Sequence, residues 1–202
     1  MIAIIDYGMG NIHSVRKALQ LVGAGTLVTN KTDDIRKCQK LVLPGVGAFA
    51  DAMAELEKQN LISVIKEEVK KKKLLLGICL GMQLLFERSQ EAKNIEGLGI
   101  LSGEVKLFNR QIGIKVPHMG WNQLSLKNTG CPLLKNISSD SYVYFCHSYY
   151  PQPDDGNIVS ASAHYGNDFA ALVWQDNVFG AQFHPEKSQE VGLAMLENFV
   201  EM

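Results

Sequence analysis

Short apolar runs alternate with amphipathic segments through the first half of the chain. In residues 11–21 the apolar side chains recur at helical spacing, whereas residues 2–5 and 74–78 are continuously apolar, as expected of strands buried on both faces. Such strands belong to parallel sheets that helices cover on both sides, so this half predicts an α/β arrangement. We expect strands at 2–5, 26–29, 41–43 and 74–78, helices at 11–21 and 51–72, and a polar connection at 31–38.

The second half of the chain has a different pattern, with many short β-like runs and few helical ones. Residues 176–177 separate two apolar runs and predict a hairpin turn. A terminal helix is expected at 189–200, and strands are expected at 105–108, 121–126, 142–149, 158–164, 171–174 and 178–183. The sequence contains no internal repeat or linker. We therefore expect a single domain, residues 1–202, whose α/β part carries antiparallel additions in its C-terminal half.

Composition and charge narrow the function classes. The 202 residues include 20 Lys+Arg and 21 Asp+Glu, for a formal net charge of -1, and such a chain lacks the basic excess of nucleic-acid binders. No apolar run approaches the ~18 residues of a membrane span, and residues 1–6 lack the basic region and cleavage site of a signal peptide. We therefore expect a cytoplasmic protein that binds neither nucleic acid nor membrane.

Two groups of polar residues have an ordinary structural interpretation. The lysines at 70–73 precede a buried strand and predict a solvated helix end, with anion binding as the alternative. Cys38, Cys131 and Cys146 lack the spacing of zinc ligands, so we interpret them as buried or partly buried thiols and expect no metal site.

Cys79 lies in a pattern typical of a catalytic nucleophile. It follows an apolar strand, precedes a helical segment and has Gly77 and Gly81 two residues away on either side. This is the context of a nucleophile elbow, a sharp strand-to-helix turn in which the helix N-terminus favours the thiolate. The N–H of Leu80 would then face an oxyanion on the attacked carbonyl. The alternative is a buried cysteine at a strand end between two glycines.

His184 and Glu186 supply the two further groups that a thiolate nucleophile needs. A base must take and return a proton, and an acceptor must hold its tautomer. Both residues follow the apolar run at 178–183, and residues two apart in an extended chain share a face, so the carboxylate can reach the imidazole. Because ligands bind where strand C-termini converge in α/β folds, we expect both residues near Cys79. A surface histidine without a catalytic role is the alternative.

The Pro-Gly-Val-Gly segment at 44–47 ends the third predicted strand. Either it is a simple turn, or the Gly45–Val46 peptide is mobile and the Val46 N–H completes an oxyanion hole with Leu80. Composition favours neither interpretation.

Together these segments resemble a known family. Residues 77–83, Gly-Ile-Cys-Leu-Gly-Met-Gln, and 183–186, Phe-His-Pro-Glu, are similar to the motifs of class I (triad) glutamine amidotransferases. The resemblance covers nearly the whole chain and implies a flavodoxin-like, mostly parallel sheet flanked by helices. Leu74 departs from the pattern, since many members have a small residue or proline there, and it affects packing only. More narrowly, the segments at 6–11, 43–47, 117–122 and 184–188 resemble the glutaminase subunits of imidazole glycerol phosphate synthases.

The resemblance implies a mechanism for this chain. Cys79 would attack the side-chain amide of L-glutamine to form a γ-glutamyl thioester, His184 would protonate the leaving ammonia and then activate water, and Glu186 would orient His184. Leu80 and Val46 would donate the oxyanion hydrogen bonds, and no cofactor is implied. The residues that match glutamine-binding positions are Gly47, Gln83, Ser148 and Tyr149.

The resemblance also implies a partner, a (β/α)8 barrel cyclase subunit that forms a heterodimer with this chain. The ammonia would pass to the cyclase, which makes imidazole glycerol phosphate and an aminoimidazole carboxamide ribotide in histidine biosynthesis. The residue types of Met119 and Trp121 agree with a place at the partner interface, because Met and aromatic side chains are enriched at interface cores. The alternative is that these residues belong to a strand packed on the sheet. The residues that match the junction and the ammonia gate are Asn11, Pro117, Met119, Trp121, Tyr144 and Lys187.

Three other functions remain open. The chain could be another cysteine hydrolase on the same kind of sheet, or a non-catalytic subunit that keeps the fold as a scaffold. It could also be a paralogous amidotransferase subunit that supplies ammonia to a different synthetase, which these motifs do not fully separate from the histidine pathway.

Overall fold

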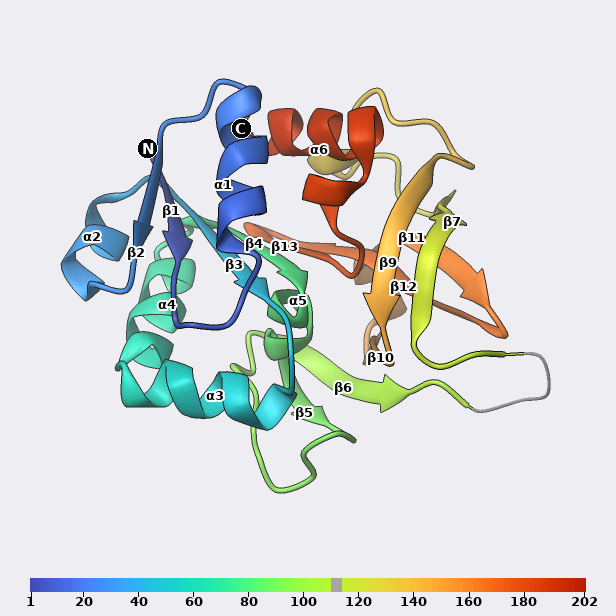
Figure 1. Ribbon diagram of the computed structural model, residues 1–202, viewed down its shortest axis with the longest axis horizontal. Coiled ribbons are helices and arrows are strands. Elements are labelled where there is room, and N and C mark those ends of the chain that lie inside the picture. The colour runs from blue at the N-terminus through green and yellow to red at the C-terminus, as the bar shows by residue number, and fades with distance from the viewer. Residues whose placement is uncertain (110–113) are drawn as a thin grey trace.

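The computed structural model describes residues 1–109 and 114–202 and is built on an eight-stranded sheet (Figure 1). The strands in spatial order are β2 (Thr26–Thr29), β1 (Ile2–Ile5), β3 (Lys40–Gly45), β4 (Leu74–Cys79), β13 (Val178–Ala181), β12 (Asn167–Gln175), β11 (Val159–Tyr165) and β8 (Ser125–Leu126). The first five are parallel and the last three are antiparallel additions. An order that begins 2-1-3-4 with one more parallel strand is flavodoxin-like, so the predicted fold class is confirmed. The predicted hairpin at 176–177 joins β12 to β13.

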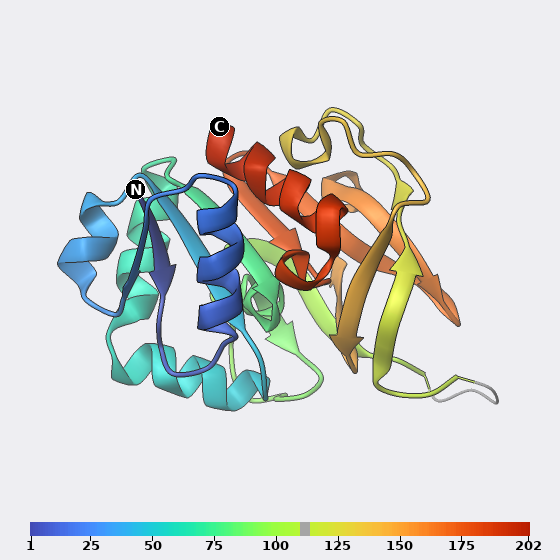
Figure 2. The ribbon, with the colours of Figure 1, turned by 45° about the horizontal axis from the view of Figure 1, so that its top comes forward.

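Helices cover both faces of this sheet (Figures 1 and 2). One face carries α1 (Ile12–Leu21) and α6 (Gln189–Glu201), the other carries α2 (Thr32–Lys37), α3 (Phe49–Lys58) and α4 (Leu61–Lys70), and the short α5 (Leu80–Leu84) follows β4 directly. Strand β1 shows why its sequence is continuously apolar: Ile2 and Ile4 pack in the core with α1 and α6, whereas Ala3 and Ile5 pack in a second core with α3 and α4. Among the helices of residues 1–109 and 114–202, none has both the length and the apolar composition of a membrane span.

Two predictions about helices are wrong in detail. The helix expected at 51–72 is divided into α3 and α4, because Asn60 adopts a left-handed conformation with φ 56° between them. The connection expected at 31–38 contains α2, whose Ile35 is buried. Its polar sequence concealed the helix, although acidic residues in the first turn and basic residues in the last complement the helix dipole.

Two small sheets lie beside the antiparallel half. One has the order β10-β6-β5, and its strands are β5 (Phe86–Ser89), β6 (Leu101–Leu107) and β10 (Tyr149–Pro153). The other pairs β7 (His118–Gln123) with β9 (Tyr142–His147) on the side of the molecule away from α2 (Figure 1). The strand expected at 142–149 is therefore divided at Ser148, where the chain passes from one small sheet to the other. Short 3-10 helices occur at η1 (Pro132–Leu134), η2 (Gly156–Ile158) and η3 (Pro185–Lys187).

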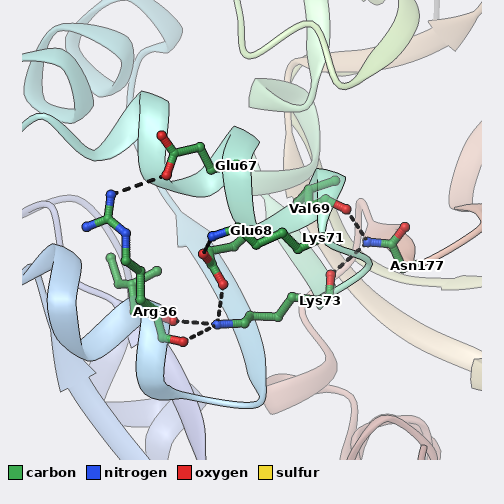
Figure 3. A network of polar contacts seen from close by, with 8 residues as sticks. Arg36, Glu67, Glu68, Val69, Lys71, Lys73 and Asn177 are labelled. Atoms are coloured by element: carbon green, nitrogen blue, oxygen red, sulfur yellow. Dashed lines mark hydrogen bonds and ion pairs between the residues drawn. The ribbon is translucent and has the colours of Figure 1, made fainter.

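Three lysines of the run, Lys70, Lys71 and Lys72, are exposed as the sequence predicted, but Lys73 is not. The Lys73 side chain is only 11% exposed and forms an ion pair of 2.6 Å with buried Glu68 (Figure 3). Its ammonium also donates hydrogen bonds of 2.9 and 2.8 Å to the carbonyls of Ile35 and Arg36. Lys73 turns inward because it lies directly before buried strand β4, three residues after α4 ends. Its charge joins α2 to α4 at the amino-terminal edge of the sheet, so it serves packing.

Candidate active site

The turn between β4 and α5 has the geometry of a nucleophile elbow. Cys79 ends β4 with φ 54° and ψ -112°, a conformation that residues other than glycine rarely adopt. The neighbouring glycines permit it: a Cβ at Gly77 would lie 2.7 Å from the carbonyl oxygen of Gly81, and a Cβ at Gly81 would overlap the carbonyl oxygen of Leu43. Close packing of β3, β4 and α5 therefore holds Cys79 in a strained conformation at the carboxyl edge of the sheet.

The end of β3 packs against this elbow. Gly45 is paired with Cys79 in the β3–β4 register, and a Cβ at Gly45 would come within 2.7 Å of the Tyr7 hydroxyl oxygen. Tyr7 donates a hydrogen bond of 2.9 Å to the carbonyl of Pro44. Burial and the negative charge of a Cys79 thiolate raise the pKa of Tyr7, so its hydroxyl remains a donor. These contacts involve Pro44 and Gly45 at the end of β3, and the Val46 side chain that follows is exposed.

The Cys79 thiol is buried among polar groups, one of which the sequence interpretation missed. Gln182 is fully buried, and its amide nitrogen donates to Sγ over 3.9 Å while its amide oxygen accepts a hydrogen bond of 3.1 Å from Gln83. The carbonyl oxygen of Cys146 lies 3.9 Å from the same sulfur. A polar side chain inside the apolar run at 178–183 is the signal that could have found Gln182.

His184 and Glu186 form a buried pair next to Cys79. Nδ1 of His184 lies 2.8 Å from Oε1 of Glu186, and the two side chains are 4% and 0% exposed. Burial by itself lowers the pKa of His184, but hydrogen bonds to Cys79 and Glu186 and the charges of both raise that pKa to about 10. The backbone of His184 is fixed by its N–H bond to Tyr144 and by the hydroxyl of Ser188, which donates to its carbonyl. A protonated imidazole is therefore held beside Cys79, an arrangement that suits thiolate chemistry.

Cys79 and His184 line a pocket of about 300 Å³. The other lining residues are Val46, Gly47, Leu80, Gln83, Glu91, Pro117, Cys146, His147, Ser148, Tyr149 and Lys187. The structure thus brings together the predicted nucleophile, base, oxyanion and glutamine-binding residues, and Glu186 contacts His184 from its buried side. Four residues of the predicted interface set lie outside the pocket lining: Asn11, Met119, Trp121 and Tyr144.

Glu91 is the one carboxylate that lines the pocket in the part of the chain that the structure describes, and the sequence interpretation missed it. Its Oε2 accepts a hydrogen bond of 3.0 Å from the backbone N–H of Phe49, the first residue of α3. The loop after β5 begins with a mostly polar stretch at 90–96, so a carboxylate there carries no signal of its own. Among the described residues, Glu91 belongs to no group of three His, Cys, Asp or Glu side chains that could hold an ion.

Exposed apolar side chains on β7 lie close to this pocket. Met119 is 61% exposed and Trp121 is 46% exposed, so these two side chains do not pack on the sheet, although the segment is a strand as the alternative had it. The Tyr144 ring lies 6.1 Å from the Trp121 ring and 6.4 Å from the His184 ring. The ammonium of Lys187 lies 5.7 Å from the centre of the Tyr144 ring. A row of aromatic rings therefore leads from the surface to the base.

Comparison with known proteins agrees with this geometry. The family model for glutamine amidotransferase class-I matches residues 3–202. Imidazole glycerol phosphate synthase subunit HisH of Bacillus cereus (strain G9842) is 51% identical to this chain over 200 residues, which are 98% of this chain and 93% of the relative. The HisH subunit of Thermosynechococcus vestitus is 48% identical, with 98% and 95% covered. A chain of the PurLQS structure from Thermotoga maritima, 20% identical and with 99% and 97% covered, has a TM-score of 0.76, which shows a shared fold.

A match along nearly the whole chain, together with relatives about half identical to it, settles the family. The chain belongs to the class I glutamine amidotransferases and, within them, to the HisH subunits of imidazole glycerol phosphate synthase.

Proposed function

We propose that this chain is a glutaminase that uses Cys79, His184 and Glu186 to release ammonia from L-glutamine. One observation carries the proposal: a strained cysteine and an imidazole paired with a buried carboxylate, far apart in the sequence, line one pocket beyond β4 and β13 through Cys79 and His184. Membership of the amidotransferase family supports the same chemistry.

The reaction has two halves. In the first, Sγ of Cys79 attacks the side-chain carbonyl carbon, and the N–H groups of Leu80 and Val46 donate to the oxyanion, the latter after its peptide reorients. His184 gives its proton to the departing nitrogen and the C–N bond breaks. Ammonia departs, and a γ-glutamyl thioester remains on Cys79. In the second, His184 takes a proton from water, which attacks the thioester and releases glutamate and the thiolate. Glu186 keeps Nδ1 of His184 protonated throughout.

The polar lining of the pocket suits an amino acid with a neutral amide side chain. We assign the binding of glutamine to Gly47, Gln83, Ser148 and Tyr149, as the family resemblance implies. Glu91 adds the negative charge that an α-ammonium group needs, because a charge-assisted hydrogen bond is stronger than a neutral one. Such a site rejects ligands that leave its polar groups unpaired.

In this proposal the ammonia passes to a cyclase subunit. The HisH relatives are named as subunits of imidazole glycerol phosphate synthase, and the exposed Met119 and Trp121 beside the pocket suit an interface core. The partner is a (β/α)8 barrel that forms a heterodimer with this chain in the cytoplasm. Its products are imidazole glycerol phosphate and an aminoimidazole carboxamide ribotide in histidine biosynthesis. The other junction residues are Asn11, Pro117, Tyr144 and Lys187.

The other functions are less well supported. A scaffold without catalysis needs neither the strained elbow nor the buried base and carboxylate. A paralogue serving a different synthetase is disfavoured because the two HisH relatives share 48% and 51% identity over 98% of the chain, whereas the PurLQS chain shares 20%.

The test is Cys79→Ala in a chain co-expressed with the barrel subunit. We expect release of glutamate and glutamine-dependent turnover of the nucleotide to fall about 10⁴-fold or more, since the nucleophile is lost. Cys38→Ala is the matched control, because Cys38 is a buried thiol at the opposite edge of the sheet. Retained glutamate release by Cys79→Ala would exclude the mechanism.

A further inference from the structure

Two buried histidines outside the triad face each other across β7 and β9. His118 and His147 are paired in the strand register, are 3% and 5% exposed, and lie 3.1 Å apart from Nδ1 of His118 to Nε2 of His147. Aromatic rings of Phe108, Phe145 and Phe169 surround them. Buried imidazoles in an aromatic cluster are costly unless their nitrogens are paired, so these hydrogen bonds define how the two rings are arranged.

The partners of the two rings determine their tautomers. Nδ1 of His147 lies 2.8 Å from the carbonyl oxygen of Tyr149, which can only accept, so this nitrogen carries the proton. Nε2 of His147 is then the acceptor, and Nδ1 of His118 donates to it. Nε2 of His118 in turn accepts from the amide of Asn122 at 3.3 Å. Every ring nitrogen has one partner, and burial lowers the pKa values of His118 and His147 to about 4 and 3, so both rings are neutral.

The hydrogen bonds that run from Asn122 through His118 and His147 to the Tyr149 carbonyl form a relay. One end of this relay reaches the wall of the catalytic pocket. The Tyr149 carbonyl accepts the hydrogen bond from His147, and it also accepts a hydrogen bond of 2.9 Å from Gln83. Ser148 lies between His147 and Tyr149 in the sequence and is the corner at which the chain leaves β9 for β10. Its carbonyl accepts a hydrogen bond of 3.1 Å from the N–H of Phe108. The His147 ring therefore spans the corner whose residues 148 and 149 line the pocket.

The other end of the relay lies on β7. His118 and Asn122 are on the inner face of this strand, and alternate residues Met119 and Trp121 are on the exposed outer face. Asn122 also donates a hydrogen bond of 2.9 Å to the carbonyl of His164 on β11, which anchors this end to the central sheet. The relay thus connects the strand that carries the exposed apolar side chains to the pocket wall.

We propose that His118 and His147 are positioning residues that hold the Ser148–Tyr149 wall in the geometry that binds glutamine. Neither residue takes part in bond making or breaking. Loss of the relay lets the wall move away from the substrate, while Cys79, His184 and Glu186 keep their own contacts. The inference rests on the proposed function only in assigning glutamine to the pocket.

The experiment compares His118→Leu with His118→Asn in the complex with the cyclase subunit. His118 lies outside the pocket, and leucine cannot donate to His147, whereas the amide of asparagine can occupy the place of Nδ1 and donate. We expect His118→Leu to raise the KM for glutamine about fivefold to tenfold and His118→Asn to restore it to within about twofold of the wild type. Alkylation of Cys79 by iodoacetamide, followed on the Cys79 peptide, should proceed at the wild-type rate in both.

Two further variants separate positioning from packing. Phe169→Leu removes packing from the same aromatic cluster but leaves the relay intact, so its KM should equal that of the wild type. If His118→Leu does not fold, Asn122→Ala breaks the relay at its half-buried end and should raise the KM about twofold to threefold.

The outcomes distinguish this inference from the proposed function. An unchanged KM in His118→Leu and Asn122→Ala would overturn the positioning role. So would a rise in the KM of Phe169→Leu equal to that of His118→Leu, or a loss of Cys79 alkylation in His118→Leu as large as its change in KM. A wild-type complex that releases no glutamate from glutamine would instead overturn the proposed function.

Discussion

Replacing Glu186 with glutamine tests whether this carboxylate keeps His184 charged. The variant retains the size and one oxygen acceptor but loses the negative charge at a fully buried position 2.8 Å from Nδ1. For charges centred about 4 Å apart in an effective dielectric constant of about 20, the lost attraction is about 4 kcal/mol. This is about three powers of ten in the protonation equilibrium of His184. The pKa of His184, about 10 in the wild-type protein, should therefore fall toward its ordinary value, because burial is no longer fully opposed.

Rate and reactivity report this change separately. We expect kcat for glutamate release by the complex to fall about 10³-fold, since the same charge stabilises the imidazolium that forms when neutral His184 takes a proton from water in the second half of the reaction. Alkylation of Cys79 by iodoacetamide near neutral pH should also slow, because the thiolate loses its charged neighbour. Glu197→Gln, an exposed carboxylate on α6, is the matched control. A Glu186→Gln variant with kcat within tenfold of the wild type and an unchanged pH profile of alkylation would refute the reasoning.

Four other predictions concern stability, binding and coupling. Lys73→Met should lower the free energy of unfolding, measured in urea melts, by about 3 kcal/mol because buried Glu68 loses an ion-pair partner. Lys72→Met, at an exposed ion pair, should change this free energy by less than about 1 kcal/mol, and equal effects of the two variants would contradict the buried network. Glu91→Gln should raise the KM for glutamine about tenfold with little change in kcat; an unchanged KM would remove Glu91 from the site. Because the pKa of His184 is raised, its stabilising contribution is complete below pH 6.5 and is lost as the pH rises to about 10. The free energy of unfolding of the wild-type protein should therefore fall more over this pH range than that of His184→Gln. Parallel plots of the two free energies against pH would contradict this. We propose that the Val46 N–H turns toward the oxyanion only with the partner bound. The isolated chain should then release glutamate about 10²–10³-fold more slowly than its complex with the cyclase and nucleotide, and equal rates would contradict this.

The elbow could be predicted because its signal is local. Gly77, Cys79 and Gly81 lie within five residues after an apolar strand, and the structure shows what each glycine avoids. The parallel sheet could be predicted because β1, β3 and β4 are apolar on both faces, as expected of strands that helices cover on both sides. Local pattern therefore indicated the covered parallel sheet and the candidate nucleophile, whereas the flavodoxin-like arrangement was implied by the family resemblance.

The residues that the sequence did not single out depend on distant neighbours. Gln182 matters because β13 lies beside β4, Glu91 because its loop reaches the first turn of α3, and His147 because β9 pairs with β7. Lys73 was misread for the same reason, since the partners that bury its charge come from α2 and α4. Periodicity and spacing carry no information about such contacts.

Covalent labelling with a glutamine analogue that carries a diazoketone in place of the amide is the most direct test of the central claim. The complex with the cyclase is treated, digested and analysed by mass spectrometry, with glutamine as competitor. We predict a single adduct on Cys79, protected by glutamine and formed in proportion to the loss of glutamate release. Label on another residue, or an unlabelled Cys79 in a preparation that still hydrolyses glutamine, would contradict the account.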